Sequence, residues 1–471
     1  MIISFIFFLL AFVAIGLLST RKSRGTKADY YLASGSVKPW LVGLSAVATN
    51  NSGYMFIGVI GYTYATGLAS IWLMIGWILG DFLASLFVHS RLHEATSRSN
   101  EVSYAGILSN WYSDNHGKLQ RLIALISLAF LLAYASAQLV AGSKALHVLF
   151  DWPSWSGALM GAILVSLYCF SGGIRASIWT DAAQSCVMIL AMGLLLVVAV
   201  HASGGINASI DSMENVDGFL DWFPKELALP GISGALLFAI SWLFAGLSVI
   251  GQPHVMVRFM TLTESDSMKR ARVWYYLWFS AFYLLSTCVG LMSRIYLADI
   301  GSFDAELALP TMALELLPPV LVGLILAGIF AATISTADSL ILSCSAALTH
   351  DLIPRKIEHP LILKLATVAI TAIALGLALA NNQSVFSLVI MAWSGLASAF
   401  APLLIVLCLG WKPGQSLSLS AVISGLAVAL LWRLMGWHEL VYEGLPGILS
   451  GLLILTAGIL VTRNRALKPH S

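Results

Sequence analysis

The sequence contains few charged residues. Lysine, arginine, aspartate and glutamate make up only 10% of its 471 residues, against about 25% in a typical soluble domain. Apolar residues make up 59%, and the mean hydropathy is +0.87. A soluble fold could not bury that much apolar surface and still cover itself with polar groups. The composition therefore predicts a polytopic protein of the lipid bilayer, with no nucleic-acid partner.

The chain also lacks the motifs of most enzymes. It contains no nucleophile–base pair and no phosphate-binding loop. No segment between the apolar runs is longer than about 30 residues, so no appended kinase, nuclease or receptor domain is expected. The cysteines lie in apolar runs without metal-ligand spacing, and we expect all of them to be buried thiols: Cys169, Cys186, Cys288, Cys344 and Cys408.

The sequence does contain about thirteen apolar runs that could cross a bilayer, which takes about 20 helical residues. No basic residues precede the first run, which therefore predicts a membrane helix and not a signal peptide. We expect an all-α fold with membrane helices at about residues 3–20, 41–65, 69–91, 122–147, 155–172, 179–203, 231–254, 273–297, 318–345, 361–381, 386–410, 416–436 and 444–462.

The basic residues predict an orientation. With the N-terminus outside, all Lys and Arg residues fall in cytoplasmic loops, at the helix ends beside them or in the C-terminal tail, except Lys144, Lys225, Arg294 and Arg433. Cytoplasmic loops of membrane proteins are enriched in these residues. The sequence therefore predicts a protein of the cell (inner) membrane whose C-terminus is cytoplasmic.

Two of the runs are poorly suited to a continuous helix. The second contains four turn-forming residues, NNSG at 50–53, and the seventh is interrupted by Gly246, Gly251 and Pro253. Paired interruptions in two halves of a chain indicate a transporter binding site. Because these breaks are five helices apart, the sequence predicts a five-plus-five core with an inverted second copy. The alternative is ordinary packing glycines and one kinking proline.

The five-helix offset divides the chain into five parts. No motif in any of these parts predicts an obligate protein partner. We expect a peripheral helix with a basic cytoplasmic loop (1–40), a first five-helix repeat (41–203), an acidic extracytoplasmic loop (204–230), an inverted second repeat (231–410) and two peripheral helices with a short basic tail (411–471).

Three acids, Asp81, Asp181 and Asp338, lie in or just beside apolar runs. A charge at the bilayer centre costs about 3 kcal/mol on insertion scales, so an acid at that depth marks a candidate functional site. Asp81 belongs to no motif of this chain, and we expect it to be a hydrogen-bonded carboxyl that faces the helix bundle.

Asp338 lies beside a row of hydroxyl groups. Four residues recur at helical spacing and so share one face of their helix: Ala332, Ser335, Thr336 and Ser339. Hydroxyls, backbone carbonyls and a nearby carboxylate are suitable ligands for hard monovalent cations. Ser and Thr also serve as ordinary contacts between membrane helices, but that role does not require a charge.

Five motifs make the sequence resemble the sodium/solute symporter family and, within it, the bacterial sodium/proline symporters. They are DYYLASGSVKPW (29–40), LSAVATNNSGYMFIG (44–58), SGGIRASIWTDAAQ (171–184), GQPHVMVRFM (251–260) and AATISTADSLILSCSAALTHDL (331–352). The resemblance covers essentially the whole chain. It implies the amino-acid/sodium symporter-type fold and sodium-driven alternating access.

The resemblance also implies cation ligands. By matched position, one Na+ between the second and ninth helices would bind the carbonyls of Ala48, Asn51 and Ala332 and the hydroxyls of Ser335 and Thr336. Some family members hold a second cation near the aspartate that Asp181 matches. The other positions implied for a second cation are Ser335, Asp338 and Ser339.

The residues that the resemblance implies near the solute are Asn50, Ser52, Gly53, Tyr134, Ala245, Val249 and Gln252. Tyr134 matches a tyrosine near the substrate of proline transporters. Those transporters carry Trp and Tyr where this chain has Ala245 and Val249, and an aspartate where Asn50 stands. The first difference bears on the identity of the solute, and the second bears on sodium affinity and stoichiometry.

The leading hypothesis is therefore sodium-coupled symport of a small organic solute, proline or another amino acid, into the cytoplasm with Na+ as the coupling ion. One alternative is proton-coupled symport of a different small organic solute, because Asp181 and Asp338 could share a proton. A transporter-like solute sensor is a third hypothesis, although the tail TRNRALKPHS offers no signalling domain.

Overall fold

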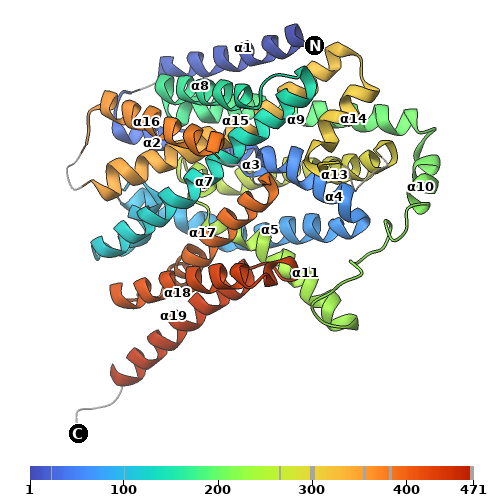
Figure 1. Ribbon diagram of the computed structural model, residues 1–471. Coiled ribbons are helices and arrows are strands. Elements are labelled where there is room, and N and C mark those ends of the chain that lie inside the picture. Colours follow the sequence, from blue (N-terminus) through green and yellow to red (C-terminus); the bar gives the residue numbers. More distant parts are fainter. Residues whose placement is uncertain are drawn as a thin grey trace.

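The computed structural model describes residues 1–22, 24–99, 101–264, 267–297, 303–353, 357–380 and 384–466. Within these residues the secondary structure is helical, and twelve helical stretches are long and apolar enough to cross a membrane. They lie side by side in Figure 1, with the short helices α2 (Lys27–Leu32) and α10 (Ile206–Glu214) at opposite ends. Residues 467–471 of the predicted basic tail lie outside the described residues.

The long elements are α1 (Ile2–Ser19), α3 (Pro39–Gly53) continued by η3 (Tyr54–Val59) and α4 (Ile60–Thr66), α5 (Ile71–Arg98), α7 (Gly117–Phe150), α8 (Ser154–Gly172), α9 (Ile174–Ala202), α11 (Gly231–Leu247) continued by η5 (Ser248–Gly251) and α12 (Pro253–Met260), α13 (Met268–Tyr296), α15 (Pro319–Ala346) continued by η8 (Ala347–Leu352), α16 (Pro360–Ala380), α17 (Val385–Cys408), α18 (Gln415–Leu434) and α19 (Gly444–Ala466). The other connecting elements are η1 (Thr20–Lys22), η2 (Ala33–Gly35), η4 (Gly67–Ser70), α6 (Tyr104–Ser109), η7 (Ala305–Leu307), α14 (Ala308–Leu316) and η9 (Trp437–Glu439).

The predicted second and third runs form one helical stretch of 60 residues, Pro39–Arg98. A straight helix of that length would measure about 90 Å, roughly three times the thickness of the bilayer core. The stretch folds back at Gly67, whose φ is 68°. As a result, Asn50 Nδ2 donates a hydrogen bond to Asp81 Oδ2 at 3.3 Å. The stretch therefore contains two crossings. The other spans coincide with the predicted runs to within about five residues, except that α12 extends the seventh run to Met260 and η8 extends the ninth run to Leu352.

Both predicted helix breaks are confirmed. In the first, Ser52, one residue before the end of α3, takes φ 46° and ψ 177°, and the wide turn of η3 follows. In the second, η5 ends at Gly251 and Gln252 is extended, with φ −98° and ψ 102°. Pro253 then begins α12, where its missing N–H removes no helical hydrogen bond.

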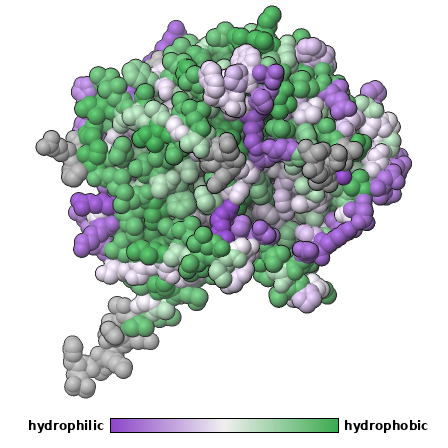
Figure 2. All heavy atoms as spheres, in the orientation of Figure 1, coloured by the Kyte–Doolittle hydropathy of each residue, from purple (hydrophilic) through white to green (hydrophobic). Residues whose placement is uncertain are grey.

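The spans divide into central and peripheral helices. Protein surrounds α15 and α17, whose most apolar stretches are 83% and 89% buried. By contrast, α1, α18 and α19 are only 28% buried and lie on the outside of the bundle in Figure 1. Figure 2 shows broad apolar areas across one face of the molecule, as expected for a surface in contact with lipid.

Helices α5 and α11 touch through their backbones. A Cβ atom on Gly80 would lie 2.0 Å from the carbonyl oxygen of Leu243, and one on Gly246 would lie 2.3 Å from that of Trp77. Small residues allow membrane helices to approach this closely. The glycines of these two helices therefore allow α5 to pack closely against α11, the first part of the second broken helix.

A backbone bridge joins the segments that flank the two broken helices. The N–H of Val37, just before α3, donates to the carbonyl of Thr261, just after α12, at 3.1 Å. The N–H of Thr263 donates back to Val37 at 3.3 Å. The start of α3 and the end of α12 are therefore hydrogen-bonded directly to each other.

The prediction that all five cysteines are buried is wrong for two of them. Cys186 on α9 is exposed and Cys288 on α13 is partly exposed. Both lie on membrane-spanning helices, where an apolar side chain can face lipid instead of protein.

Glu306 caps the start of α17. Its carboxylate accepts hydrogen bonds from the backbone N–H of Val385 (3.2 Å), the N–H of Phe386 (2.9 Å) and the hydroxyl of Ser384 (2.7 Å). Lys144 Nζ lies 2.5 Å from the same carboxylate. A carboxylate at a helix N-terminus satisfies free N–H groups and complements the helix dipole. Glu306, on η7, therefore joins this short helix to α7 and α17.

We expect Glu306→Ala to lower the free energy of unfolding by about 2–4 kcal/mol, because it removes a charged cap and leaves Lys144 without this partner. Thermal melting of the purified protein in detergent measures the effect. Glu439→Ala, at an exposed position, serves as the control. Equal melting temperatures for the two variants would contradict the capping role.

Candidate functional site

Hydroxyl groups of α15 lie against carbonyl groups of α3 one turn before its break. Ser335 Oγ lies 3.2 Å from the Ala48 carbonyl oxygen and 3.1 Å from that of Ala332. Thr336 Oγ1 lies 2.9 Å from the carbonyl oxygen of Thr49. Hard cations bind oxygen at about 2.3–2.6 Å, so two ligands at right angles are about 3.3–3.7 Å apart. A small outward movement would therefore open this oxygen cluster to a cation.

Four of the five residues implied as ligands of the first Na+ meet at this point. The fifth, Asn51, uses its carbonyl within the break, where it accepts a hydrogen bond from the N–H of Tyr54. Thr49, which the sequence did not single out, supplies a further carbonyl to the cluster.

The residues implied for a second cation also come together, and the structure adds an arginine to them. Ser177 Oγ lies 2.9 Å from Asp338 Oδ1 and 3.4 Å from Asp181 Oδ2. Ser339 Oγ lies 3.1 Å from Asp338 Oδ1. Arg258 Nη2 lies between the two acids, 3.4 Å from Asp181 Oδ2 and 3.9 Å from Asp338 Oδ1. All three charged side chains are fully buried.

Arg258 lies in the last turn of α12, but its full burial was not expected from the sequence. The seventh apolar run was predicted to stop near residue 254, but α12 continues to Met260 and carries Arg258 into the bundle. The GQPHVMVRFM motif contains a signal for this burial. Its arginine follows a mostly apolar stretch that could continue as a helix beyond residue 254.

Several of the residues implied for the solute surround the first break. The N–H of Gly53 donates to Gln138 Oε1 on α7 at 2.8 Å. The hydroxyl of Ser52 accepts from the N–H of Tyr54 at 3.0 Å and from the hydroxyl of Tyr134 at 3.3 Å. The break is therefore held against α7 by two side chains that also face the interior.

The second break is lined by an aromatic residue from another helix. Trp393 on α17 donates its indole N–H to the carbonyl of Ala245 at 2.9 Å, and its own carbonyl accepts from Gln252 Nε2 at 2.8 Å. Its ring lies 5.4 Å from that of Trp77 and 6.2 Å from that of His254. Trp393 thus places an aromatic side chain beside Ala245, although this position itself carries none.

His254 connects the two breaks, since its ring also lies 5.4 Å from that of Tyr134. Val249, at the start of the second break, contributes its carbonyl to the N–H of Gln252 and is buried. Among the described residues, several buried polar atoms near the breaks have no hydrogen-bond partner: Asn50 Oδ1, Asn51 Oδ1, Tyr54 OH, Gln138 Nε2, Gln252 Oε1 and both ring nitrogens of His254. Buried polar groups are rarely left unpaired, so these atoms indicate a place for a polar ligand.

Asn50 faces a different cluster. Asp81 accepts hydrogen bonds from the hydroxyls of Tyr275 (2.6 Å) and Tyr276 (2.7 Å) and from Asn50 Nδ2 (3.3 Å). The prediction that Asp81 is a hydrogen-bonded carboxyl facing the bundle is confirmed. It joins α3, α5 and α13 immediately before the first break.

We expect Asp81→Ala to destabilise the protein by about 2–4 kcal/mol, because it leaves the hydroxyls of Tyr275 and Tyr276 without their acceptor. Asp81→Asn retains one acceptor oxygen and should cost less. Thermal melting of the two variants measures this order. A smaller loss for Asp81→Ala than for Asp81→Asn would contradict the proposed hydrogen-bond role.

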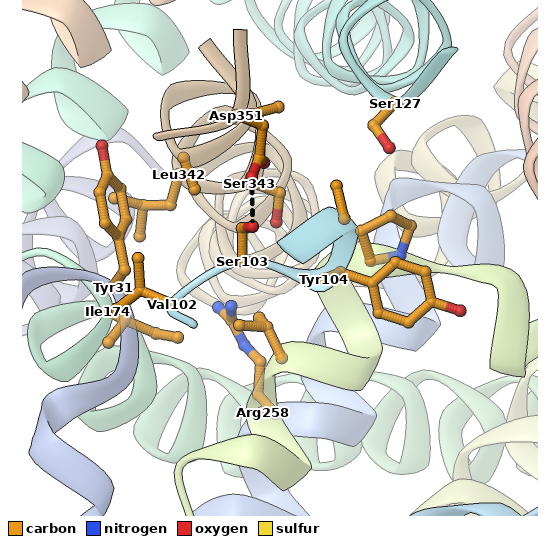
Figure 3. A pocket seen from close by; sticks show the side chains of 15 residues that line it. Tyr31, Val102, Ser103, Tyr104, Ser127, Ile174, Arg258, Leu342, Ser343 and Asp351 are labelled. Carbon is orange, nitrogen blue, oxygen red and sulfur yellow. Dashed lines mark hydrogen bonds between the residues drawn. The ribbon is translucent and has the colours of Figure 1, made fainter. Parts of the chain in front are cut away.

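A narrow cavity of about 30 Å³ reaches Arg258 from one end of the bundle. Figure 3 shows Arg258 pointing into it from α12, opposite the hydrogen bond between Ser103 and Asp351. Ser127 and Ser343 add further hydroxyl groups to its wall. Most of the cavity wall is apolar, and Arg258 supplies a charged group at its edge.

A sequence profile of the sodium:solute symporter family matches residues 30–425. The chain belongs to this family. It is therefore a membrane transporter and not an enzyme, and Na+ is the coupling ion of its symport.

Individual symporters resemble the whole chain. The high-affinity proline transporter of Bacillus subtilis (strain 168) is 30% identical over 445 residues, covering 92% of each chain. The osmoregulated proline transporter of the same organism is 31% identical over 475 residues, covering 98% of this chain and 94% of its own. The sodium/proline symporter of Escherichia coli (strain K12) is 28% identical over 471 residues, covering 96% and 91%.

Solved structures show the same fold. A Na+-coupled sialic acid symporter in a substrate-bound outward-open state superposes with a TM-score of 0.81 at 18% identity and covers 97% of each chain. Mhp1, a transporter of the nucleobase-cation-symport-1 family, gives a TM-score of 0.59 at 15% identity and covers 92% of this symporter and 95% of its own chain. The predicted five-plus-five inverted-repeat fold is confirmed.

Proposed function

We propose that this symporter imports a small amino acid, with proline as the first candidate, together with Na+ by alternating access. The observation that carries the proposal is the contact of the Ser335 and Thr336 hydroxyls with carbonyls beside the first helix break. The relatives named as proline transporters support the choice of solute class.

In this proposal Na+ binds the carbonyls of Ala48, Asn51 and Ala332 and the hydroxyls of Ser335 and Thr336, with the Thr49 carbonyl as a further oxygen. Binding would draw Asn51 towards α15 and so tighten the break. Asp181, Asp338 and Ser339 are proposed to form the neighbouring second cation-binding site.

The solute is proposed to lie between the two breaks, in contact with Ser52, Gly53, Tyr134, Ala245, Val249 and Gln252, with Asn50 at the edge of the site. Gln138 Nε2 and His254 offer donors without partners for a carboxylate. Trp77 and Trp393 supply the aromatic surface that Ala245 and Val249 do not. A small zwitterion with an apolar ring fits this combination of neutral polar atoms and aromatic faces.

We further propose that the protein lies in the cell (inner) membrane with its N-terminus outside and its C-terminus in the cytoplasm. The distribution of Lys and Arg supports this orientation. Four exposed tryptophans lie near the proposed outer surface, as membrane anchors do: Trp152, Trp155, Trp222 and Trp437. The repeats are proposed to span 41–203 and 231–410, between a peripheral helix (1–40), an outer loop (204–230) and two peripheral helices (411–471).

Uptake of radiolabelled L-proline by proteoliposomes tests the function. We expect accumulation with an inward Na+ gradient and none when K+ replaces Na+. Competition by an excess of other amino acids would define the solute range. Accumulation that ignores Na+ and follows an imposed pH gradient would instead establish proton coupling, and solute binding without any uptake would favour a sensor.

A further inference from the structure

We propose that Arg258 is a tethered cation that fills the second cation site and limits this symporter to one Na+ per transport cycle. The inference rests on the sodium-coupled symport proposed above and specifies its stoichiometry.

The first argument is geometric. Arg258 Nη2 lies between Asp181 and Asp338, at 3.4 Å and 3.9 Å from their nearer oxygens. It also donates to Ser177 Oγ at 2.6 Å and to Ser339 Oγ. The acids and the serine that would hold a second Na+ are therefore the groups that hold the guanidinium. A sodium ion among them would lie beside a like charge in a buried site, where water screens it little.

The second argument is the charge balance. With both carboxylates ionised, Asp181 and Asp338 carry two negative charges and Arg258 carries one positive charge, so the buried trio retains one negative charge. Unpaired buried charge is strongly unfavourable. One Na+ at the neighbouring first site neutralises it, and a second Na+ would leave an excess positive charge.

The third argument is contiguity with the first sodium site. Thr49 offers its carbonyl to Thr336 and places its own hydroxyl 3.5 Å from Asp181 Oδ2 and 3.0 Å from Ser339 Oγ. Ser339 Oγ in turn donates to the carbonyl of Ser335 at 2.6 Å. The side chains of Thr49 and Ser339 therefore connect the acidic pair to the oxygens that would bind Na+.

Arg258 differs from a second Na+ because it cannot leave. It is part of α12, which belongs to a broken helix, whereas Asp181 and Asp338 are on α9 and α15. The positive charge therefore remains with the protein through the cycle, and the chain needs only one ion from solution to complete the balance.

Equilibrium binding of ²²Na+ to the purified symporter tests the proposal without requiring a known solute. We expect one Na+ per chain with a Hill coefficient near one. Arg258→Gln exposes two negative charges and should raise the number to two. Arg258→Lys restores the positive charge and should return it to one. Two ions per wild-type chain, or one per Arg258→Gln chain, would overturn the proposal.

Arg175→Gln is the matched control, because Arg175 is also buried and pairs with an acid, Asp29, at 2.6 Å, away from the sodium site. It should leave the number of bound ions at one. If Arg258→Gln does not fold, the double variant Arg258→Gln/Asp338→Asn keeps the net charge of the cluster at −1. This variant should bind one Na+, whereas binding of none would contradict the charge balance.

A further variant separates the tethered cation from a second Na+ site that uses Asp338. Asp338→Asn makes the trio neutral and leaves no negative charge for Na+ to balance, so we expect no saturation of Na+ binding at the concentrations that saturate the wild type. A fall from two ions to one would show that Asp338 binds Na+. Absence of any ²²Na+ binding to a folded wild-type protein would instead refute sodium coupling itself.

Discussion

Replacing Thr336 by valine is expected to raise the Na+ concentration for half-maximal uptake by about 10- to 100-fold. This range corresponds to the roughly 1.5–3 kcal/mol that an oxygen contributes when it bonds to a charged group. Valine has nearly the same shape as threonine, so the change removes one oxygen next to the Thr49 carbonyl with little effect on packing. Sodium titration of uptake in proteoliposomes measures the effect.

The same variant distinguishes a sodium ligand from an ordinary helix contact. If Thr336 serves only to pack α15 against α3, the valine variant will melt at a lower temperature but keep its sodium dependence. Ser343→Ala is the control on the same helix, since the Ser343 hydroxyl donates within α15 to the carbonyl of Ser339 at 2.9 Å. It should leave the sodium titration unchanged.

Replacing Gly80 by leucine is expected to prevent formation of a stable, monodisperse protein. Forcing extra atoms into a packed interior costs about 1–3 kcal/mol or more, and here the obstacle at 2.0 Å is the backbone of Leu243. A backbone atom cannot rotate away as a side chain can, so α5 and α11 would have to separate. Size-exclusion chromatography in detergent and thermal melting measure the loss.

The control for this substitution is Gly193→Leu on α9. A Cβ atom on Gly193 has no neighbouring atom within 4 Å, so the added side chain meets open space. This variant should elute and melt like the wild type. Equal behaviour of the Gly80 and Gly193 variants would show that the close approach of α5 and α11 is dispensable.

The helix breaks could be predicted from the sequence because their residues are out of place in a membrane. The run NNSG at 50–53 and the residues Gly246, Gly251 and Pro253 have poor helical preference inside otherwise apolar runs. The hydroxyl face of α15 was predictable for a similar reason, since helical geometry fixes which residues share a side. Local information was sufficient for these features.

Contacts that depend on how distant segments pack could not be predicted. The indole of Trp393 reaches Ala245 across 148 positions of sequence, and nothing in either segment indicates the other. Asp81 meets Asn50 only because the chain turns back at Gly67. Arg258 was missed because its depth depends on where α12 ends, and helix ends are the least certain part of a sequence-based prediction.

The bridge between Val37 and the segment after α12 has a mechanical consequence. Its two backbone hydrogen bonds connect the start of α3 to the end of α12, so we expect these two ends to move together. A solute that displaces α12 therefore also pulls on α3, whose other end carries the carbonyls of Ala48 and Thr49. Movement of the second broken helix would thus change the positions of the carbonyl oxygens on the first.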